Sequence, residues 1–233
     1  LFADAPTITL FPLTDPTPRI DPLEELSPVG LVARMPIALI ASSDQPPQTV
    51  AQLIERAKRL PSSINYASAG EGSTSHLAAE LFALTTGAPT VHVDYNGSLS
   101  AINAVVTGQV ELGFVPLPAV LPFISGGKLR IVALASSQRH PATGNIPTFA
   151  ESGVDGFDAG GWFGVFAPAR TPGNIVSLLN YALNRALAED YLRQSFTVQG
   201  LMPAPGSADQ LRMQAEADTA RWHSLVKRIT VAR

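Results

Sequence analysis

Short apolar runs and longer stretches with helical spacing alternate through the middle of the chain. The runs of strand length are residues 64–67, 91–94, 110–114 and 130–135. Between them apolar residues recur every three or four positions, as at Leu77, Leu81 and Leu84, a spacing that indicates amphipathic helices. Another helix begins at Thr49, which forms a capping box with Gln52. Strands that alternate with helices predict a parallel or mixed α/β sheet with helices on its faces.

Two longer apolar segments flank this alternating region. Residues 29–42 form two short runs that meet at Met35-Pro36, and residues 160–168 form an extended run among glycines. Both have the composition of buried extended strands. We interpret them as crossings between two lobes of the chain.

The two ends of the chain have different patterns. Residues 1–28 are rich in Pro and Thr, so we expect a strand end and a long surface connection there. After residue 168 the pattern is mostly helical, and the last helix opens with the capping box Ser207 and Gln210. A stripe at helical spacing after Pro172 predicts a buried helix face made of Ile175, Leu178, Leu179, Ala182, Leu183 and Ala186.

Composition narrows the class of protein. The chain has 233 residues and 45% hydrophobic content, enough for one large or two small domains. A net charge of −3 argues against nucleic-acid binding through phosphate neutralisation. The absence of cysteine excludes disulfides and Cys-ligated metals, and the remaining histidines lack metal-ligand spacing. We therefore expect no metal and no cofactor.

The sequence shows neither a transmembrane run nor a signal peptide, and it begins with Leu1 rather than Met. From this start we expect a processed or partial product.

The loop Tyr66-Ala-Ser-Ala-Gly-Glu-Gly-Ser-Thr-Ser-His76 between a strand and a helix is the main candidate site. Gly70 and Gly72 allow amide groups to approach a ligand closely, and Ser73 and Thr74 add hydroxyl donors. The helix that follows adds unpaired N–H groups and the positive end of its dipole, which together suit a carboxylate or a phosphate. A turn that only caps the helix is the commoner use of such a sequence. The loop is neither a Walker motif nor a dinucleotide fingerprint.

Three nearby residues extend this candidate. His76 is either a ligand donor, a base for Ser73 or Ser75, or a helix-start residue bonded to backbone. The turn Tyr95-Asn96-Gly97-Ser98 follows the next strand, so we expect it to lie beside the glycine loop. Tyr95 is either a pocket wall or a half-buried aromatic.

An ordered set of motifs along the chain resembles one family. The motifs are residues 65–78, Val91-His-Val-Asp-Tyr95-Asn-Gly97-Ser98, Gly126-Gly127-Lys128-Leu129, Ile146-Pro147-Thr148 and Trp162-Phe163-Gly164. They resemble the Bug (TctC-type) solute receptors, the extracytoplasmic binding proteins of tripartite tricarboxylate transporters.

The resemblance implies an α/β, two-lobed periplasmic-binding-protein type II fold that closes on a small carboxylate. The lobes would be residues 1–37 plus 162–233 and residues 38–161. The ligand-binding residues it implies are Ser68, Gly70, Gly72, Ser73, Thr74, His76, Tyr95, Gly97, Ser98, Ala5 and Thr7. The implied protein is periplasmic, performs no chemistry and delivers its ligand to membrane permease subunits. We expect a monomer.

Two features depart from the family. Phe114-Val115-Pro116-Leu117 replaces an acidic turn that is common there, which leaves the ligand's identity open. Family members also begin with an earlier strand and two βα units of about 30 residues each. We therefore expect a truncated first lobe and weak or absent ligand binding, with no dissociation constant below about 10 µM, which corresponds to about −7 kcal/mol.

Two other functions compete with the receptor hypothesis. The effector-sensing domain of a transcription regulator shares the two-lobed fold, and a helix-turn-helix before Leu1 would favour it. A hydrolase using Ser73 or Ser75 with His76 is the third, although no Gly-x-Ser-x-Gly elbow surrounds either serine.

Overall fold

A computed structural model gives the fold and describes residues 1–14, 21–43, 49–61, 64–124 and 126–232. The chain divides into two compact units. Unit 1 contains Leu1–Arg34 and Gly161–Arg233, and unit 2 contains Met35–Gly160. Among the described helices, none combines the length and the hydropathy that a membrane span requires.

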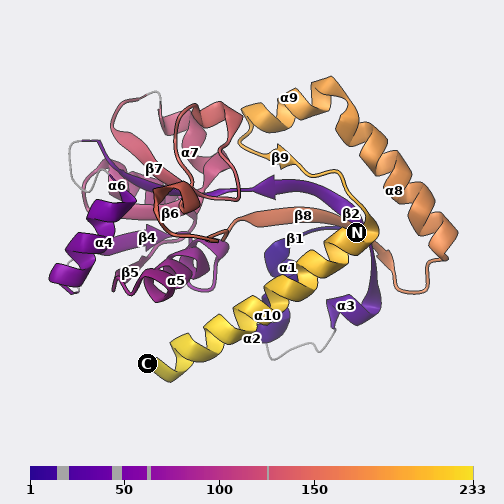
Figure 1. The fold of residues 1–233 in the computed structure, drawn as a ribbon, viewed down its shortest axis with the longest axis horizontal. Helices are drawn as coiled ribbons and strands as arrows, with labels where there is room; N and C mark the ends of the chain where they lie inside the picture. The colour runs from indigo at the N-terminus through magenta and orange to yellow at the C-terminus, as the bar shows by residue number, and fades with distance from the viewer. Residues whose placement is uncertain (15–20, 44–48, 62–63, 125, 233) are drawn as a thin grey trace. The chain divides into compact units, whose positions relative to one another are not determined.

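Unit 2 is built on a mixed sheet of five strands (Figure 1). Its elements are β3 (Ile37–Ser42), α4 (Val50–Arg59), β4 (Asn65–Ser68), α5 (Thr74–Thr86), β5 (Val91–Asp94), α6 (Ser98–Val106), β6 (Leu112–Pro116), α7 (Leu117–Ile124), β7 (Leu129–Ala135) and the 3-10 turns η1 (Pro141–Thr143) and η2 (Ala150–Ser152). The strand order is β5-β4-β6-β3-β7. β4 runs parallel to β5 and β6, whereas β3 is antiparallel to β6 and β7. The α/β class expected from the sequence is confirmed, and of the two sheet types left open, parallel or mixed, the structure has the mixed one.

Alternation along the strands gives unit 2 a core on each face of its sheet. In β6, Val115 contributes to an aliphatic cluster with Ile102 and Val105 of α6. The neighbouring Phe114 contributes to an aromatic cluster on the other face, where its ring contacts Phe82 of α5. Successive side chains of a strand point to opposite faces, so α5 and α6 cover the two sides of the sheet.

β6 begins two residues later than the apolar run at 110–114 suggested. The amides of Gln109 and Val110 both donate to the carbonyl oxygen of Ala104 at the end of α6. The backbone is therefore still engaged with the helix at these positions. Val110 is buried but does not belong to the strand. Its apolar side chain is therefore explained by its burial alone.

Unit 1 has a sheet in the order β1-β8-β2-β9 with helices packed against it. Its elements are β1 (Phe2–Asp4), α1 (Ala5–Thr9), α2 (Phe11–Thr14), α3 (Pro22–Glu25), β2 (Leu26–Met35), β8 (Gly161–Pro168), α8 (Gly173–Ala188), α9 (Asp190–Val198), β9 (Met202–Pro203) and α10 (Ala208–Ala232). The segment before β2, for which we expected a strand end and a surface connection, forms β1 and three short helices among its described residues, and Ile8 and Leu10 in it are buried. Residues 15–20 of the predicted connection lie outside the described residues.

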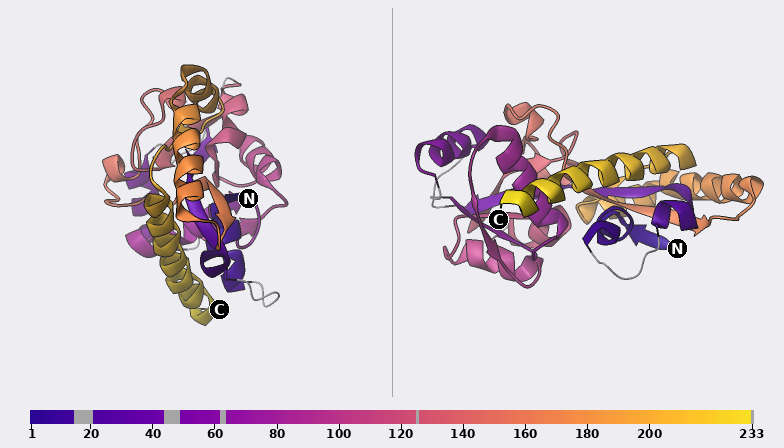
Figure 2. Two further views of the ribbon diagram at one scale, coloured as in Figure 1. Left: turned by 90° about the vertical axis from the view of Figure 1, so that its right-hand side faces the viewer. Right: turned by 90° about the horizontal axis from the view of Figure 1, so that it is seen from below.

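α10 is a single continuous helix (Figure 2). Both limbs of its predicted capping box are present: the Gln210 amide donates to Ser207 Oγ at 3.2 Å, and the Ser207 amide donates to Gln210 Oε1 at 2.8 Å. Leu211 packs with Trp162 and Phe166 of β8 in the core of this unit. Trp222 and Leu225 of the same helix are also buried.

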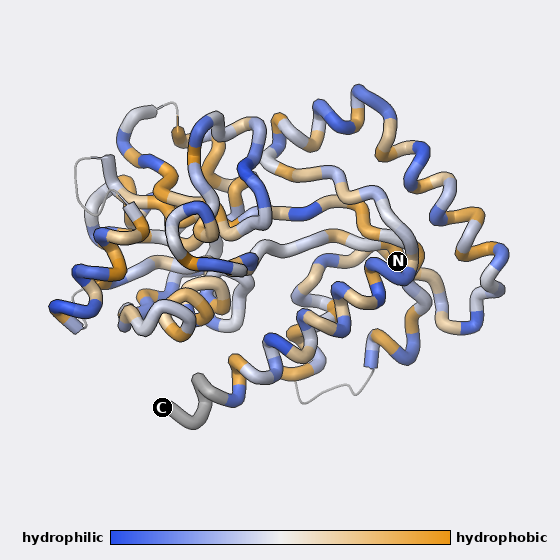
Figure 3. The backbone as a smooth tube through the Cα atoms, viewed as in Figure 1, coloured by the Kyte–Doolittle hydropathy of each residue, from blue (hydrophilic) through white to orange (hydrophobic). Residues whose placement is uncertain are grey.

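The predicted buried face of α8 is wrong. The helix carries both hydrophobic and hydrophilic bands (Figure 3), and Ile175, Leu178 and Leu179 are 41%, 62% and 44% exposed. Ala182 and Ala186 are exposed as well, and Leu183 is half-buried.

A different and partly polar face of α8 packs against the rest of unit 1. Asn180 donates to the carbonyl oxygens of Val29 and Gly206, at 2.7 and 2.8 Å. Asn184 accepts from the Gly206 amide at 2.8 Å, and Leu187 is buried. Residues 180, 184 and 187 follow helical spacing, so this face is a regular helix surface that uses amide groups where the sequence reasoning looked only for apolar ones.

Candidate functional site

The glycine loop connects the carboxyl end of β4 to α5 in unit 2. Gly70 and Gly72 have φ angles of 131° and 73°, a region that side chains with a Cβ rarely occupy. Ser73 is the N-cap of α5, and its hydroxyl accepts from the His76 amide at 3.2 Å. The Ser73 amide in turn donates to the Gly70 carbonyl at 3.1 Å. These bonds fold the loop back onto the start of the helix.

The loop leaves backbone donors at the N-terminus of α5. Within the described part of the chain, the amides of Thr74 and Ser75 have no hydrogen-bond acceptor. Thr74 is half-buried, and its hydroxyl stands at the same helix terminus. Unpaired N–H groups and the positive end of the helix dipole together favour an anion, such as a carboxylate.

The turn after β5 lies directly beside this loop. The Gly97 amide donates to the carbonyl oxygen of Ala69 at 3.2 Å. A Cβ built on Gly70 would lie 3.7 Å from the carbonyl oxygen of Tyr95. Gly97 has φ 90° and precedes α6, whose first residue is Ser98. The structure thus brings together the predicted residues of the two turns at the ends of parallel neighbouring strands.

Tyr95 is half-buried and packs against the aliphatic core cluster. This contact matches the structural alternative that the sequence left open. Its contact with a ligand stays a prediction.

Three aromatic rings form a stack beneath the glycine loop. His92 of β5 lies between Tyr66 and His76, with ring centroids 5.1 and 4.2 Å away. The Nε2 atom of His92 lies 2.7 Å from Ser68 Oγ, and Ser68 is fully buried. Sequence reasoning missed His92. The strand register could have identified it, because the parallel pairing of β4 with β5 places His92 opposite Tyr66.

His76 is tied to the loop through its other ring nitrogen. Its Nδ1 atom accepts a hydrogen bond from the Gly72 amide at 3.0 Å. Its Nε2 atom lies 3.7 Å from Glu80 Oε1, which also accepts from the Tyr66 hydroxyl at 2.8 Å. His76 is only 3% exposed. Its ring therefore lies between the backbone of the loop and Glu80, and its bond to the Gly72 amide holds the loop in place.

The environment of His92 opposes its charge. Burial is the main cause that lowers the pKa of His92, and the neighbouring His76 lowers it further. The carboxylates of Asp94, Glu80 and Glu71 act in the opposite direction but do not outweigh these causes. His92 is thus held toward its neutral form in the ligand-free protein.

The contacts do not match the serine–histidine pair required by the hydrolase hypothesis. Ser73 Oγ accepts from the backbone amide of His76, as a helix cap does. The His76 Nδ1 atom is occupied by the Gly72 amide, and Ser75 is only 1% exposed. The close contact between a serine hydroxyl and a histidine ring in this region joins Ser68 to His92, and it involves neither Ser73, Ser75 nor His76.

Ala5 and Thr7, the two predicted site residues of unit 1, belong to α1. Ala5 is buried. The hydroxyl and the amide of Thr7 both donate to Asp4 Oδ1, so Thr7 takes part in the cap of α1. Their predicted part in ligand binding remains a prediction.

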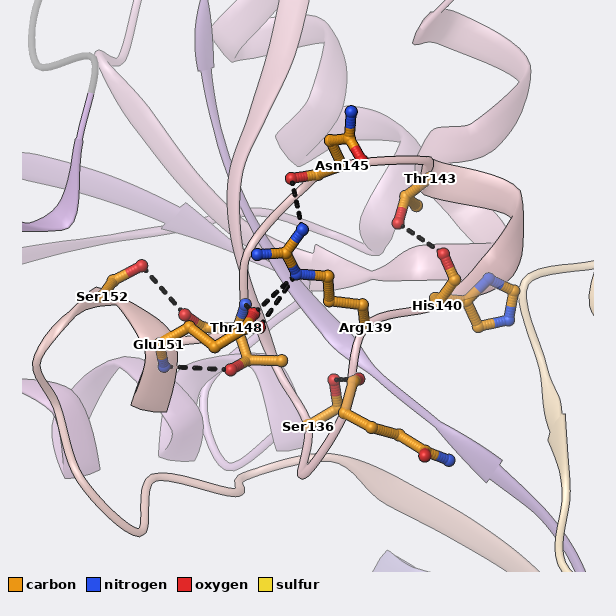
Figure 4. A network of polar contacts seen from close by, with 9 residues as sticks. Ser136, Arg139, His140, Thr143, Asn145, Thr148, Glu151 and Ser152 are labelled. Carbon is orange, nitrogen blue, oxygen red and sulfur yellow. Dashed lines mark hydrogen bonds and ion pairs between the residues drawn. The ribbon is translucent and has the colours of Figure 1, made fainter.

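A polar network fixes the segment after β7 (Figure 4). Arg139 Nε donates to both carboxylate oxygens of Glu151 at 2.9 Å, and Glu151 also accepts from the Thr148 amide at 2.8 Å. The hydrogen bond from Arg139 is the main cause that lowers the pKa of Glu151. Buried His140 caps η1 by accepting from the Ala142 amide. These groups pair with one another, which indicates a structural role.

A separate hollow of about 590 Å³ adjoins this network. It lies between the start of α4, β7 and η2 and is lined by Thr49, Val50, Ala51, Ile131, Val132, Ile146, Pro147, Glu151 and Ser152. No glycine-loop residue lines it. Among the described residues there is also no cluster of three or more His, Asp or Glu side chains placed to hold a metal ion.

Comparison with known sequences identifies a family. The model of the tripartite tricarboxylate transporter family receptor matches residues 3–231. Protein BugT of Bordetella pertussis is 35% identical over 205 residues, which are 88% of this chain and 63% of that protein. This chain thus spans less than two thirds of the length of this curated relative.

Solved structures agree with the fold. Rpa4515 of R. palustris, solved with adipate, is 33% identical with a TM-score of 0.82 over 97% of this chain and 76% of that one. MatC of Rhodopseudomonas palustris, solved with bound malate, is 28% identical with a TM-score of 0.76 over 97% of this chain and 78% of that one. The two units therefore form a periplasmic-binding-protein type II fold.

Proposed function

Because the chain belongs to the tripartite tricarboxylate transporter receptor family, we propose that it is a solute-binding protein that captures a small carboxylate and performs no chemistry. The observation that carries the proposal is the glycine loop. It combines two glycines at positive φ with unpaired amides at the start of α5. Such donors bind a carboxylate without a charged side chain.

Two solved relatives support the class of ligand. Rpa4515 was solved with adipate and MatC with malate, and both molecules are small dicarboxylates. We propose that the glycine loop and the adjacent turn bind one carboxylate of such a ligand. The proposed contacts are Ser68, Gly70, Gly72, Ser73, Thr74, His76, Tyr95, Gly97 and Ser98, with Ala5 and Thr7 contributing from unit 1.

The cellular part of the proposal follows from the family. We propose that the protein is extracytoplasmic and monomeric, and that it hands its ligand to membrane permease subunits. The match to a receptor family of tripartite tricarboxylate transporters supports this. In this proposal units 1 and 2 correspond to the two lobes, and the segments at 29–42 and 160–168 connect them.

Calorimetric titration with adipate and malate tests the proposal. We expect both diacids to bind weakly, with dissociation constants above about 10 µM. Adipamide, the neutral diamide of adipate, should bind at least about tenfold more weakly, because it lacks the charge that the helix terminus favours.

A pair of glycine variants locates the site. Gly72→Ala should weaken adipate binding at least about fivefold, because a Cβ limits the approach of the loop amides. Gly127→Ala is the matched control: its φ of 68° is close to the 73° of Gly72, and both positions are open around the Cβ. Equal effects of the two variants on affinity, or equal affinity for adipate and adipamide, would contradict the proposed site.

A further inference from the structure

The charged groups near the glycine loop have the wrong sign for an anion site. Glu71 lies within the loop, and a Cβ built on Gly70 would be 3.9 Å from Asp94 Oδ1. Glu80 lies on α5 below the loop. The described groups that act electrostatically on His92 are these three carboxylates and His76, with no Lys or Arg among them. A bound carboxylate therefore adds a further negative charge to an already acidic region.

Only the two stacked histidines of this cluster are able to supply a positive charge. Their ring centroids are 4.2 Å apart with an interplanar angle of 15°, so a charge on one opposes a charge on the other. One proton on the pair is therefore the stable charged state. The question is which ring accepts it.

His76 is poorly placed to accept a proton. Its Nδ1 atom already accepts from the Gly72 amide at 3.0 Å, so a proton there would set two donors against each other. Its Nε2 atom is the nitrogen nearer to Glu80 and accordingly carries the hydrogen of the neutral ring. Protonating His76 would thus break the bond that holds the loop.

His92 accepts a proton without losing a hydrogen bond. In the neutral tautomer that carries its hydrogen on Nδ1, Nε2 accepts from the Ser68 hydroxyl across 2.7 Å. When Nε2 is protonated it donates to Ser68 Oγ instead, and the Ser68 hydroxyl turns to the Gly70 carbonyl oxygen at 3.3 Å. The Gly70 amide donates to Ser68 Oγ in both states. The face of Tyr66 on the other side of His92 also favours a cationic ring.

We propose that His92 takes up a proton when an anion binds the glycine loop, and so acts as a positioning residue that supplies the charge the loop lacks. The inference rests on the proposed function, because it needs an anion at this loop. Ser68 connects the protonated ring to Gly70 and thus to the ligand-binding backbone.

The sign of the pH effect follows from linkage. Burial and His76 lower the pKa of His92 in the free protein, and an added negative charge raises it on binding. Between these two values binding takes up a proton, so affinity increases as the pH falls. Above the bound-state value, His92 stays neutral and affinity no longer depends on pH.

The test is a titration of malate into the 233-residue chain at about pH 8 and about pH 6, where malate remains mostly a dianion. We expect about fivefold to tenfold tighter binding at the lower pH, with uptake of up to one proton per ligand. Uptake is measured from the heat of binding in two phosphate-free buffers that differ in ionisation enthalpy. His92→Gln, which keeps a polar group toward Ser68 but does not titrate, should lose both the uptake and the pH effect.

His223→Gln is the control, because His223 is an exposed histidine on α10 of unit 1, and it should retain the proton uptake. If His92→Gln does not fold, the ring signals of His92 in wild-type protein give the same answer: malate should raise the pH at which they titrate. Malate binding without proton uptake, or uptake that survives in His92→Gln, would overturn the role of His92 alone. Failure of malate and adipate to bind at either pH would overturn the proposed function with it.

Discussion

At the scale of single residues, Asp218 is a buried carboxylate surrounded by donors. It accepts from Trp162 Nε1 at 2.7 Å, from Gln214 Nε2 at 3.1 Å and from Arg221 Nη2 at 2.7 Å. An Asn side chain would place an NH₂ group against one of these donors and remove the charge facing Arg221. We expect Asp218→Asn to lower the free energy of unfolding in urea by about 3 kcal/mol. Glu216→Gln, on the exposed side of the same helix, should change it by less than about 0.5 kcal/mol.

The functional residues were only partly predictable at this scale. The glycine loop was identified from local sequence, because positive φ and helix capping depend on residues that are adjacent in the chain. His92 was missed because its partners Ser68 and His76 become neighbours only through the pairing of β4 with β5. Pairwise geometry of this kind requires the strand register, which periodicity alone does not give.

At the scale of elements, α8 shows that an apolar pattern predicts the presence of a helix more reliably than it predicts which face of the helix is buried. The helix was predicted correctly, but the pattern marked the exposed face as the buried one. We expect Asn184→Ala to destabilise the chain by about 1 to 2 kcal/mol, because it removes bonds to both polar groups of Gly206. Leu178→Ala should cost no more than about 0.5 kcal/mol. Chemical denaturation of both variants measures these changes in the free energy of unfolding. A larger decrease for Leu178→Ala than for Asn184→Ala would show that the apolar face of α8 is the packed one.

At the scale of the whole molecule, the alternation of strands and helices was sufficient to predict the α/β class. The mixed character of the sheet in unit 2 comes from β3, the antiparallel strand that follows the break at Pro36. The family was recognisable because its motifs occur in order along the chain, and the family match over residues 3–231 confirms it. The identity of the ligand was not predictable, because backbone donors recognise the charge of a carboxylate but contact little of the rest of the ligand.

The central claim is that a carboxylate binds at the glycine loop. The most direct measurement is an amide NMR titration with adipate, which reports every backbone donor separately. We predict that the amide signals of Thr74 and Ser75, the unpaired donors, shift most, with one common dissociation constant, and that adipamide leaves them nearly unchanged. Unchanged loop amides, or the largest shifts at Ile131 and Ser152 around the separate hollow, would contradict the claim.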